Sequence, residues 1–306
     1  ARQGGGGLAQ SRWVAWREGF ALVGVLLASA LPALWGWAWT TALLVAMLAL
    51  GLFTWLRTAQ RIGLPVAQPP ALSAGSPAHD GVSLWQPWKH AGFRRLLGVF
   101  MLNGLASAVP ATLVLFFVQD RLQAPQAMEP LFLGVYFAAG ALSFPLWLRV
   151  IDRMGLLRTW ALGMGLSVLA FVSVIGLGAG DTTGFGVVCV LSGMALGADL
   201  TVPGALLNQL IDRCGERGRT DGAFMGWWNL ATKLNLALAA GLSLPLLGLW
   251  GYAPGRQDAD AVLALGLAYG LLPCVLKLLA ALALYAGLMC APAAIAGSEA
   301  STPTSV

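Results

Sequence analysis

Charged residues are scarce in this chain of 306 residues, in which Asp, Glu, Lys and Arg together make up only 10%. Soluble domains usually carry about 25% charged residues. No charge at all occurs between Gly19 and Leu56, and a helix needs roughly 20 mostly apolar residues to cross a bilayer. The sequence therefore predicts a membrane protein, with two spans in this interval that turn between Pro32 and Trp39.

Histidine and cysteine are also rare, which bears on metal sites and on enzymes. The two histidines, His79 and His90, share one polar loop, and none of the four cysteines belongs to a CxxC pair. Zinc sites need ligands of these types at close spacing. A membrane-embedded enzyme would need His, Asp or Cys gathered at one membrane face. We therefore expect no catalytic residue, no metal, no cofactor and no enzymatic activity.

The long apolar runs predict an all-α fold, a multi-pass transmembrane bundle of about eight spans. The expected helices cover residues 18–35, 37–57, 95–119, 130–150, 157–178, 184–212, 222–250 and 262–290. A stretch rich in Pro, Ser, Gly and Ala follows the second helix and is typical of a flexible linker. The expected parts are two helices over 1–60, a linker over 61–92, six helices over 93–292 and a tail over 293–306.

The basic residues are distributed unevenly between the two sets of loops. Of the 18 Lys and Arg residues, 14 lie in residues 1–17, 57–95, 149–158 and 213–221, whereas the other set of loops holds only Arg121 and Arg256. Loops rich in Lys and Arg stay on the cytoplasmic side. We expect a multi-pass protein of the cell (inner) membrane with both termini in the cytoplasm. Because these residues bracket apolar spans and form no patch, nucleic acid is not an expected partner.

Two of the apolar runs carry an ion near their middle. Asp199 precedes the charged loop at 213–221, and Lys233 follows it about 17 Å into its span at the usual helical rise. Ionisable groups at bilayer depth are costly and usually face a polar interior or an aqueous cavity. The pattern indicates solute passage through a membrane, with Asp199 either taking up a proton or balancing Lys233 or Lys277. For Lys277, in the last span, a structural role is favoured.

The chain resembles the second half of a major facilitator transporter, and more specifically the glycoside–pentoside–hexuronide:cation symporters, whose best-known member is the melibiose permease. The segment WLRVIDRMGLLRTW resembles a basic loop that recurs in this superfamily. Three longer stretches carry the narrower match, and their sequences are WREGFALVGVLLASALP (16–32), GADLTVPGALLNQLIDRCGERGRTDGAF (197–224) and WWNLATKLNLALAAGLSLPLLGLWGY (227–252).

This resemblance implies twelve helices, of which the chain supplies those that look like helices five to twelve. The four missing helices carry the family's cation-binding acidic residues, so we expect a fragment whose Na⁺ or H⁺ site lies outside it. The resemblance also places Arg17 where family members have a sugar-contacting Arg, and Lys233 near the sugar and cation sites. One departure stands out, because Asn208 or Gln209 occupies a position that is often acidic in the family.

Three further residues are candidates for substrate contact. Asn103 interrupts an apolar span and can bond a neighbouring helix or line a cavity. Asn229 lies one turn before Lys233 on the same face. Trp228 can stack on a sugar ring, but its place near a loop also fits an interfacial aromatic belt.

The resulting hypothesis is a secondary active transporter that moves a sugar or related polar solute with Na⁺ or H⁺ by alternating access. The expected partners are that solute and the lipid bilayer, and the full-length protein is expected to be a monomer. A transporter of lipid-like or amphipathic solutes and a non-transporting membrane scaffold remain the alternatives.

Overall fold

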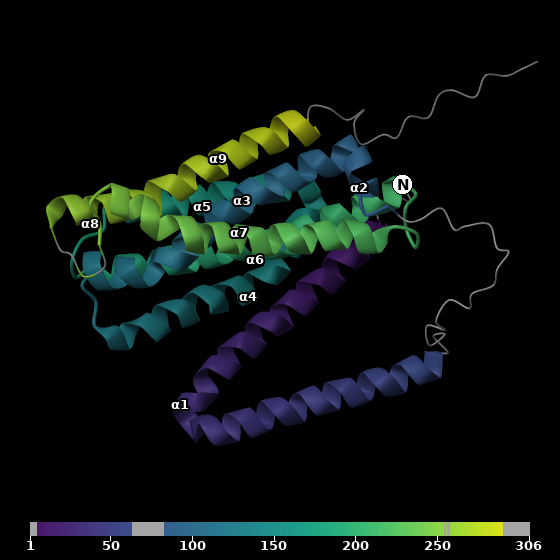
Figure 1. Cartoon of the computed structure of the whole chain (residues 1–306), viewed down its shortest axis with the longest axis horizontal. Coiled ribbons are helices and arrows are strands. Elements are labelled where there is room, and N and C mark those ends of the chain that lie inside the picture. Colours follow the sequence, from purple (N-terminus) through teal and green to yellow (C-terminus); the bar gives the residue numbers. More distant parts are fainter. Residues whose placement is uncertain (1–4, 63–82, 254, 256–257, 290–306) are drawn as a thin grey trace, which may run out of the picture. The chain divides into compact units, whose positions relative to one another are not determined.

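The computed structural model describes residues 5–62, 83–253, 255 and 258–289. Only some side chains are described before residue 35, and none at residues 59–62. The chain divides into two compact units, one of residues 21–82 and the other of residues 1–20 with 83–306. In the described residues all regular elements are helices (Figure 1). The expected tail and most of the expected linker lie outside the described residues.

The first helix, α1, runs from Gly5 to Ile62 and is broken at Gly36, where φ is 78° and ψ is 163°. Glycine adopts a positive φ without the steric cost that a Cβ imposes. The turn that the sequence places between Pro32 and Trp39 is therefore confirmed. Trp35–Thr58 is long and apolar enough to cross a membrane. The first expected span, 18–35, falls in a part of α1 where most side chains are not described.

The second unit contains six long helical spans that run side by side (Figure 1). Two of them are interrupted or extended by the three π-helical turns η1, η3 and η4, in which the hydrogen bonds skip one residue more than in an α-helix. The elements are α2 (Gln86–Lys89), α3 (Ala91–Phe116), η1 (Phe117–Arg121), η2 (Gln126–Met128), α4 (Glu129–Met154), α5 (Leu156–Val174), α6 (Thr182–Arg213), α7 (Asp221–Leu249), α8 (Ala259–Gly266), η3 (Leu267–Leu271), α9 (Leu272–Leu284) and η4 (Tyr285–Met289).

Small residues allow α4 and α6 to approach closely. A Cβ added at Gly193 would clash with the carbonyl oxygen of Tyr136, and one added at Gly197 would clash with Ser143 Oγ. Contacts of this kind are common in membranes, where lipid tails give helices no hydrophobic reason to associate and packing must supply the attraction. The α4–α6 pair thus forms a tight wall of the bundle.

Two apolar cores lie at opposite ends of the bundle. One is built around Phe117, Phe185 and Tyr269, and the other around Phe93, Trp160 and Phe224. Between these cores, α3, α6 and α9 each carry a polar or charged side chain, namely Asn103, Asp199 and Lys277. This leaves a polar layer at mid-length of the spans, which is where the candidate site lies.

One end of the bundle is tied together by Arg121. Its guanidinium donates to the carbonyl oxygens of Leu177 at 3.0 Å, Ile175 at 3.0 Å and Val262 at 3.2 Å. Gly266 leaves room for this group, since an added Cβ would lie 2.6 Å from Arg121 Nη1. The loops near residues 121, 177 and 262 therefore meet at one end, as the alternating loop sets predict.

At the other end, α2 docks beside the loop between α6 and α7. Gln86 Nε2 donates to Glu216 Oε1 at 2.9 Å, and the ring of Trp88 meets that of Trp227 edge-on with 5.1 Å between centroids. Glu216 also accepts a hydrogen bond from Thr220 Oγ1 at 2.8 Å. The hydrogen bonds from Gln86, the largest cause, and from Thr220 lower the pKa of the Glu216 carboxyl. This end holds the basic loops, and its cytoplasmic orientation stays a prediction.

Candidate functional site

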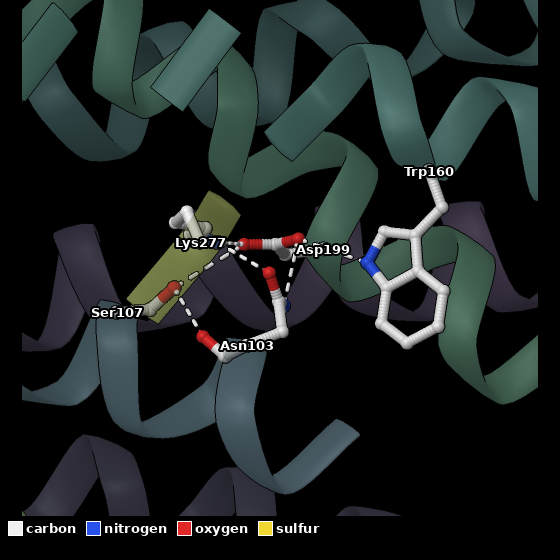
Figure 2. A network of polar contacts seen from close by, with 5 residues as sticks. All are labelled: Asn103, Ser107, Trp160, Asp199 and Lys277. Atoms are coloured by element: carbon white, nitrogen blue, oxygen red, sulfur yellow. Dashed lines mark hydrogen bonds and ion pairs between the residues drawn. The ribbon is translucent and has the colours of Figure 1, made fainter. Parts of the chain in front are cut away.

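Asp199 lies at mid-length of α6, and its carboxylate is the centre of the polar layer. Oδ1 accepts hydrogen bonds from Asn103 Nδ2 at 3.0 Å and from Trp160 Nε1 at 3.2 Å. Oδ2 lies 2.5 Å from Lys277 Nζ and 3.3 Å from Ser107 Oγ (Figure 2). Four donors from α3, α5 and α9 thus converge on one carboxylate, which satisfies a charge that bilayer depth would otherwise penalise.

Lys277 is the cation of this cluster. Its side chain is only 1% exposed, and its ammonium also lies 2.7 Å from Asn103 Oδ1. The sequence favoured a structural role for this residue. The structure buries Lys277 in the polar layer. The sequence left Lys233 and Lys277 as possible partners of Asp199, and the structure shows that Lys277 forms the ion pair.

Asn103 connects the two ions because its amide has both a donor and an acceptor. It donates through Nδ2 to Asp199 and accepts through Oδ1 from Lys277, the orientation that the two opposite charges demand. The sequence indicated that Asn103 either bonds a neighbouring helix or lines a cavity, and it bonds two helices. Among the described residues, Asn103, Asp199 and Lys277 form one continuous network.

Trp160 and Ser107 belong to the same network but were not predicted from the sequence. Ser107 lies one helical turn after Asn103, and this i,i+4 spacing was a usable signal. Trp160 is fully buried, and a buried indole N–H normally needs an acceptor. Since nothing in one sequence shows that α5 packs against α6, the acceptor itself could not be named.

A cavity of about 160 Å³ extends from Asp199 between α3, α4, α5, α6 and η3. Its walls combine hydroxyl groups with aromatic rings. The polar lining consists of Ser107, Tyr136, Ser167, Ser192, Asp199 and Tyr269. The Asp199 side chain is 12% exposed while that of Lys277 is 1% exposed, so the carboxylate is the member of the ion pair that the cavity reaches.

Four predicted site residues lie apart from this network. Lys233 and Asn229 are exposed on α7, and the Asn229 amide donates to the Met225 carbonyl at 2.9 Å. Trp228 stacks on Phe100 with 3.9 Å between ring centroids. Arg17, on α1, has an exposed side chain. Of the predicted site residues, the structure therefore brings together Asn103 and Asp199 but not Lys233.

The exposed face of α7 is not a typical lipid-facing surface. Lys233 lies about 18 Å from the helix start at the usual rise, and small or polar residues surround it on one stripe of the helix. The exposed members of this stripe are Gly222, Gly226, Asn229, Lys233, Ala237 and Ala240. A lysine at this depth is costly when it faces lipid.

A bundle of long apolar helices that buries an ion pair and a partly polar cavity at mid-length has the architecture of a membrane transporter. A family model described as "MFS/sugar transport protein" matches residues 10–286, most of the chain. The chain therefore belongs to this family of the major facilitator superfamily. No match to a curated protein was found. The narrower resemblance to melibiose permease stays a prediction.

Proposed function

We propose that this chain forms part of a secondary active transporter that carries a sugar or related polar solute together with H⁺ or Na⁺ by alternating access. The observation that carries the proposal is the exposed Lys233 at mid-length of α7, on a stripe of small and polar residues. This face suits an aqueous passage, because small side chains leave space and Lys233 and Asn229 offer donors to solute hydroxyl groups. In alternating access, such a face closes against the other half of the transporter.

The network around Asp199 supports the same function from inside the bundle. Ionisable residues buried in membrane spans commonly mark ion pathways and proton relays. The cavity beside Asp199 offers hydroxyl groups and aromatic rings, which are the groups that bind a polar ring with apolar faces. An engineered cavity of about 150 Å³ holds one benzene-sized ring, so this cavity suits a small ring or several waters.

The apolar part of the same cavity favours a second candidate function. Its lining includes Phe132, Leu133, Phe137 and Phe171, which suit the apolar portion of an amphipathic solute. A transporter of lipid-like solutes in the same superfamily would use this surface. Solute specificity is therefore the property to test first.

Uptake into proteoliposomes tests the proposal. The full-length natural protein is reconstituted and offered radiolabelled hexoses, pentosides, hexuronides and lysophosphatidylcholine, with pH and Na⁺ gradients imposed in turn. We expect accumulation of one polar class, lost in Lys233→Leu and largely retained in Leu230→Ala, a change at an exposed α7 position. Accumulation of the lysolipid alone would support the second candidate. No accumulation of any class would contradict both.

A further inference from the structure

Prolines interrupt three helices within about one turn of the buried ion pair. Pro203 follows Asp199 by four residues in α6, so the Asp199 carbonyl has no backbone N–H to accept from at its i+4 position. Pro110 lies three residues after Ser107 in α3. Pro273 is the second residue of α9, four residues before Lys277, and lies two residues after the end of the π-helical turn η3. Helices bend most readily at prolines and π-helical turns.

The chemistry around Asp199 selects the ion that this site can bind. The carboxylate is surrounded by donors, namely the ammonium of Lys277, the amide of Asn103, the indole of Trp160 and the hydroxyl of Ser107. A metal cation needs several oxygen acceptors around it. Here the ammonium of Lys277 holds Asn103 Oδ1 and Asp199 Oδ2, while the Asn103 amide and the Trp160 indole hold Asp199 Oδ1. A proton needs only one carboxylate oxygen.

We propose that Asp199 is a proton-binding site of the transporter, and that its protonation releases the Asp199–Lys277 ion pair close to the prolines of α3, α6 and α9. A hydronium ion in the adjoining cavity gives its proton to Oδ2 and leaves as water. The ion pair then becomes a neutral carboxylic acid and an ammonium, so the net charge of the pair rises from zero to +1. Lys277 keeps its contact with Asn103 Oδ1.

No other described group that lines this cavity takes up the proton in its place. The titratable neighbours are Tyr136 on α4, Cys189 on α6 and Tyr269 on η3, and α9 contributes Lys277. From α3 and α5 the cavity is lined only by groups that do not titrate, including Ser107 and Ser167. Phenol, thiol and ammonium groups hold their protons at neutral and acidic pH, which leaves the Asp199 carboxylate.

Release of the ion pair gives the bundle two discrete arrangements. In the first arrangement the Asp199–Lys277 ion pair connects α6 to α9 across the polar layer. In the second arrangement the ion pair is broken, and α3, α6 and α9 bend at their prolines. A packed core with a bistable contact converts a local charge change into a helix movement. The role of this proton in driving solute transport rests on the proposed function. In that function, the proton is the coupling ion.

Infrared difference spectroscopy of the reconstituted full-length protein tests the site without any solute. The pH is lowered stepwise at constant Na⁺ concentration. We expect a carboxylic-acid carbonyl band to grow while a carboxylate band declines, and we expect Asp199→Asn to lack this pair of bands. Lys277→Met should move their midpoint to higher pH, because the carboxylate loses its cation. Glu129→Gln, at the start of α4, removes a carboxyl outside the network and should leave the bands in place.

A double variant keeps the test valid if the single variants fail to fold. Asp199→Asn combined with Lys277→Met removes both charges, and we expect it to fold, as its thermal unfolding will show, and to lose uphill uptake driven by a pH gradient. Uphill uptake by this variant would overturn the proposal, as would Asp199-dependent bands that respond to Na⁺ at constant pH. If no solute accumulates but the bands titrate, the proton site stands and the proposed function fails.

Discussion

Trp160 and Lys277 hold opposite oxygens of the Asp199 carboxylate. The indole lies 3.2 Å from Oδ1 on one side, and the ammonium lies 2.5 Å from Oδ2 on the other (Figure 2). The carboxylate is thus fixed in orientation by α5 and α9, two helices that also pack against each other. Because Trp160 reports on Asp199 directly, its fluorescence should change when the ion pair opens.

Removing one member of the ion pair should destabilise the protein more than removing both. Asp199→Asn or Lys277→Met alone leaves an uncompensated buried group, which costs about 3–5 kcal/mol for buried pairs. The double neutral variant should recover most of this loss. Thermal unfolding in detergent micelles measures the difference. Lys233→Met serves as control, since its side chain is exposed and the change should cost less than about 0.5 kcal/mol.

Close packing of α4 against α6 should make two glycines intolerant of a methyl group. Gly193→Ala places a Cβ against the Tyr136 carbonyl, and Gly197→Ala places one against Ser143. Overpacking of this kind typically costs about 1–3 kcal/mol. Gly186→Ala, also in α6, is the matched control because an added Cβ there meets nothing within 4 Å. Equal thermal stability of all three variants would contradict the close approach of the two helices.

Docking of α2 should weaken at low pH. The pKa of Glu216 is lowered by its hydrogen bonds to Gln86 and Thr220, so the folded state binds this proton less readily than the unfolded state does. The stabilisation is therefore present above the ordinary carboxyl pKa of 4.5 and is lost as the pH falls through the lowered value.

Amide hydrogen exchange of residues 84–90 over a pH series, corrected for intrinsic exchange rates, measures this docking. Glu216→Gln should remove the pH dependence, and Gln86→Leu should reduce it. As a control, Glu129→Gln changes a carboxyl that bonds Gln119 at the start of α4 and should have no effect on α2. Unchanged pH dependence in Glu216→Gln would mean that another group controls the docking.

The orientation of the bundle is tested by chemical labelling. We expect residues 120–129, 179–183 and 251–261 to face the outside, because the basic loops stay cytoplasmic. In a background without the four native cysteines, Asp181→Cys in intact cells should react with an impermeant thiol reagent. Arg153→Cys should react only after the membrane is opened. The opposite labelling pattern would reverse the orientation.

The sequence was sufficient to predict seven of the spans and two members of the polar network. Charge-free runs locate helices directly, and the break at Gly36 falls inside the predicted turn. Asp199 and Asn103 were identified because polar groups stand out in apolar spans. The sequence did not identify the ion-pair partner of Asp199, because Lys233 and Lys277 were both possible. The packing of α3 against α9 and α6 is needed to choose between them. Trp160 was missed for the same reason.

The three carbonyl oxygens held by Arg121 make one end of the bundle a pivot. To separate α5 from the last span there, the guanidinium would have to lose hydrogen bonds to Ile175, Leu177 and Val262 at once. A small tilt about this fixed point is amplified with distance along helices of about 40 Å. The opposite end, with α2 and the α6–α7 loop, is therefore expected to travel furthest during each transport cycle.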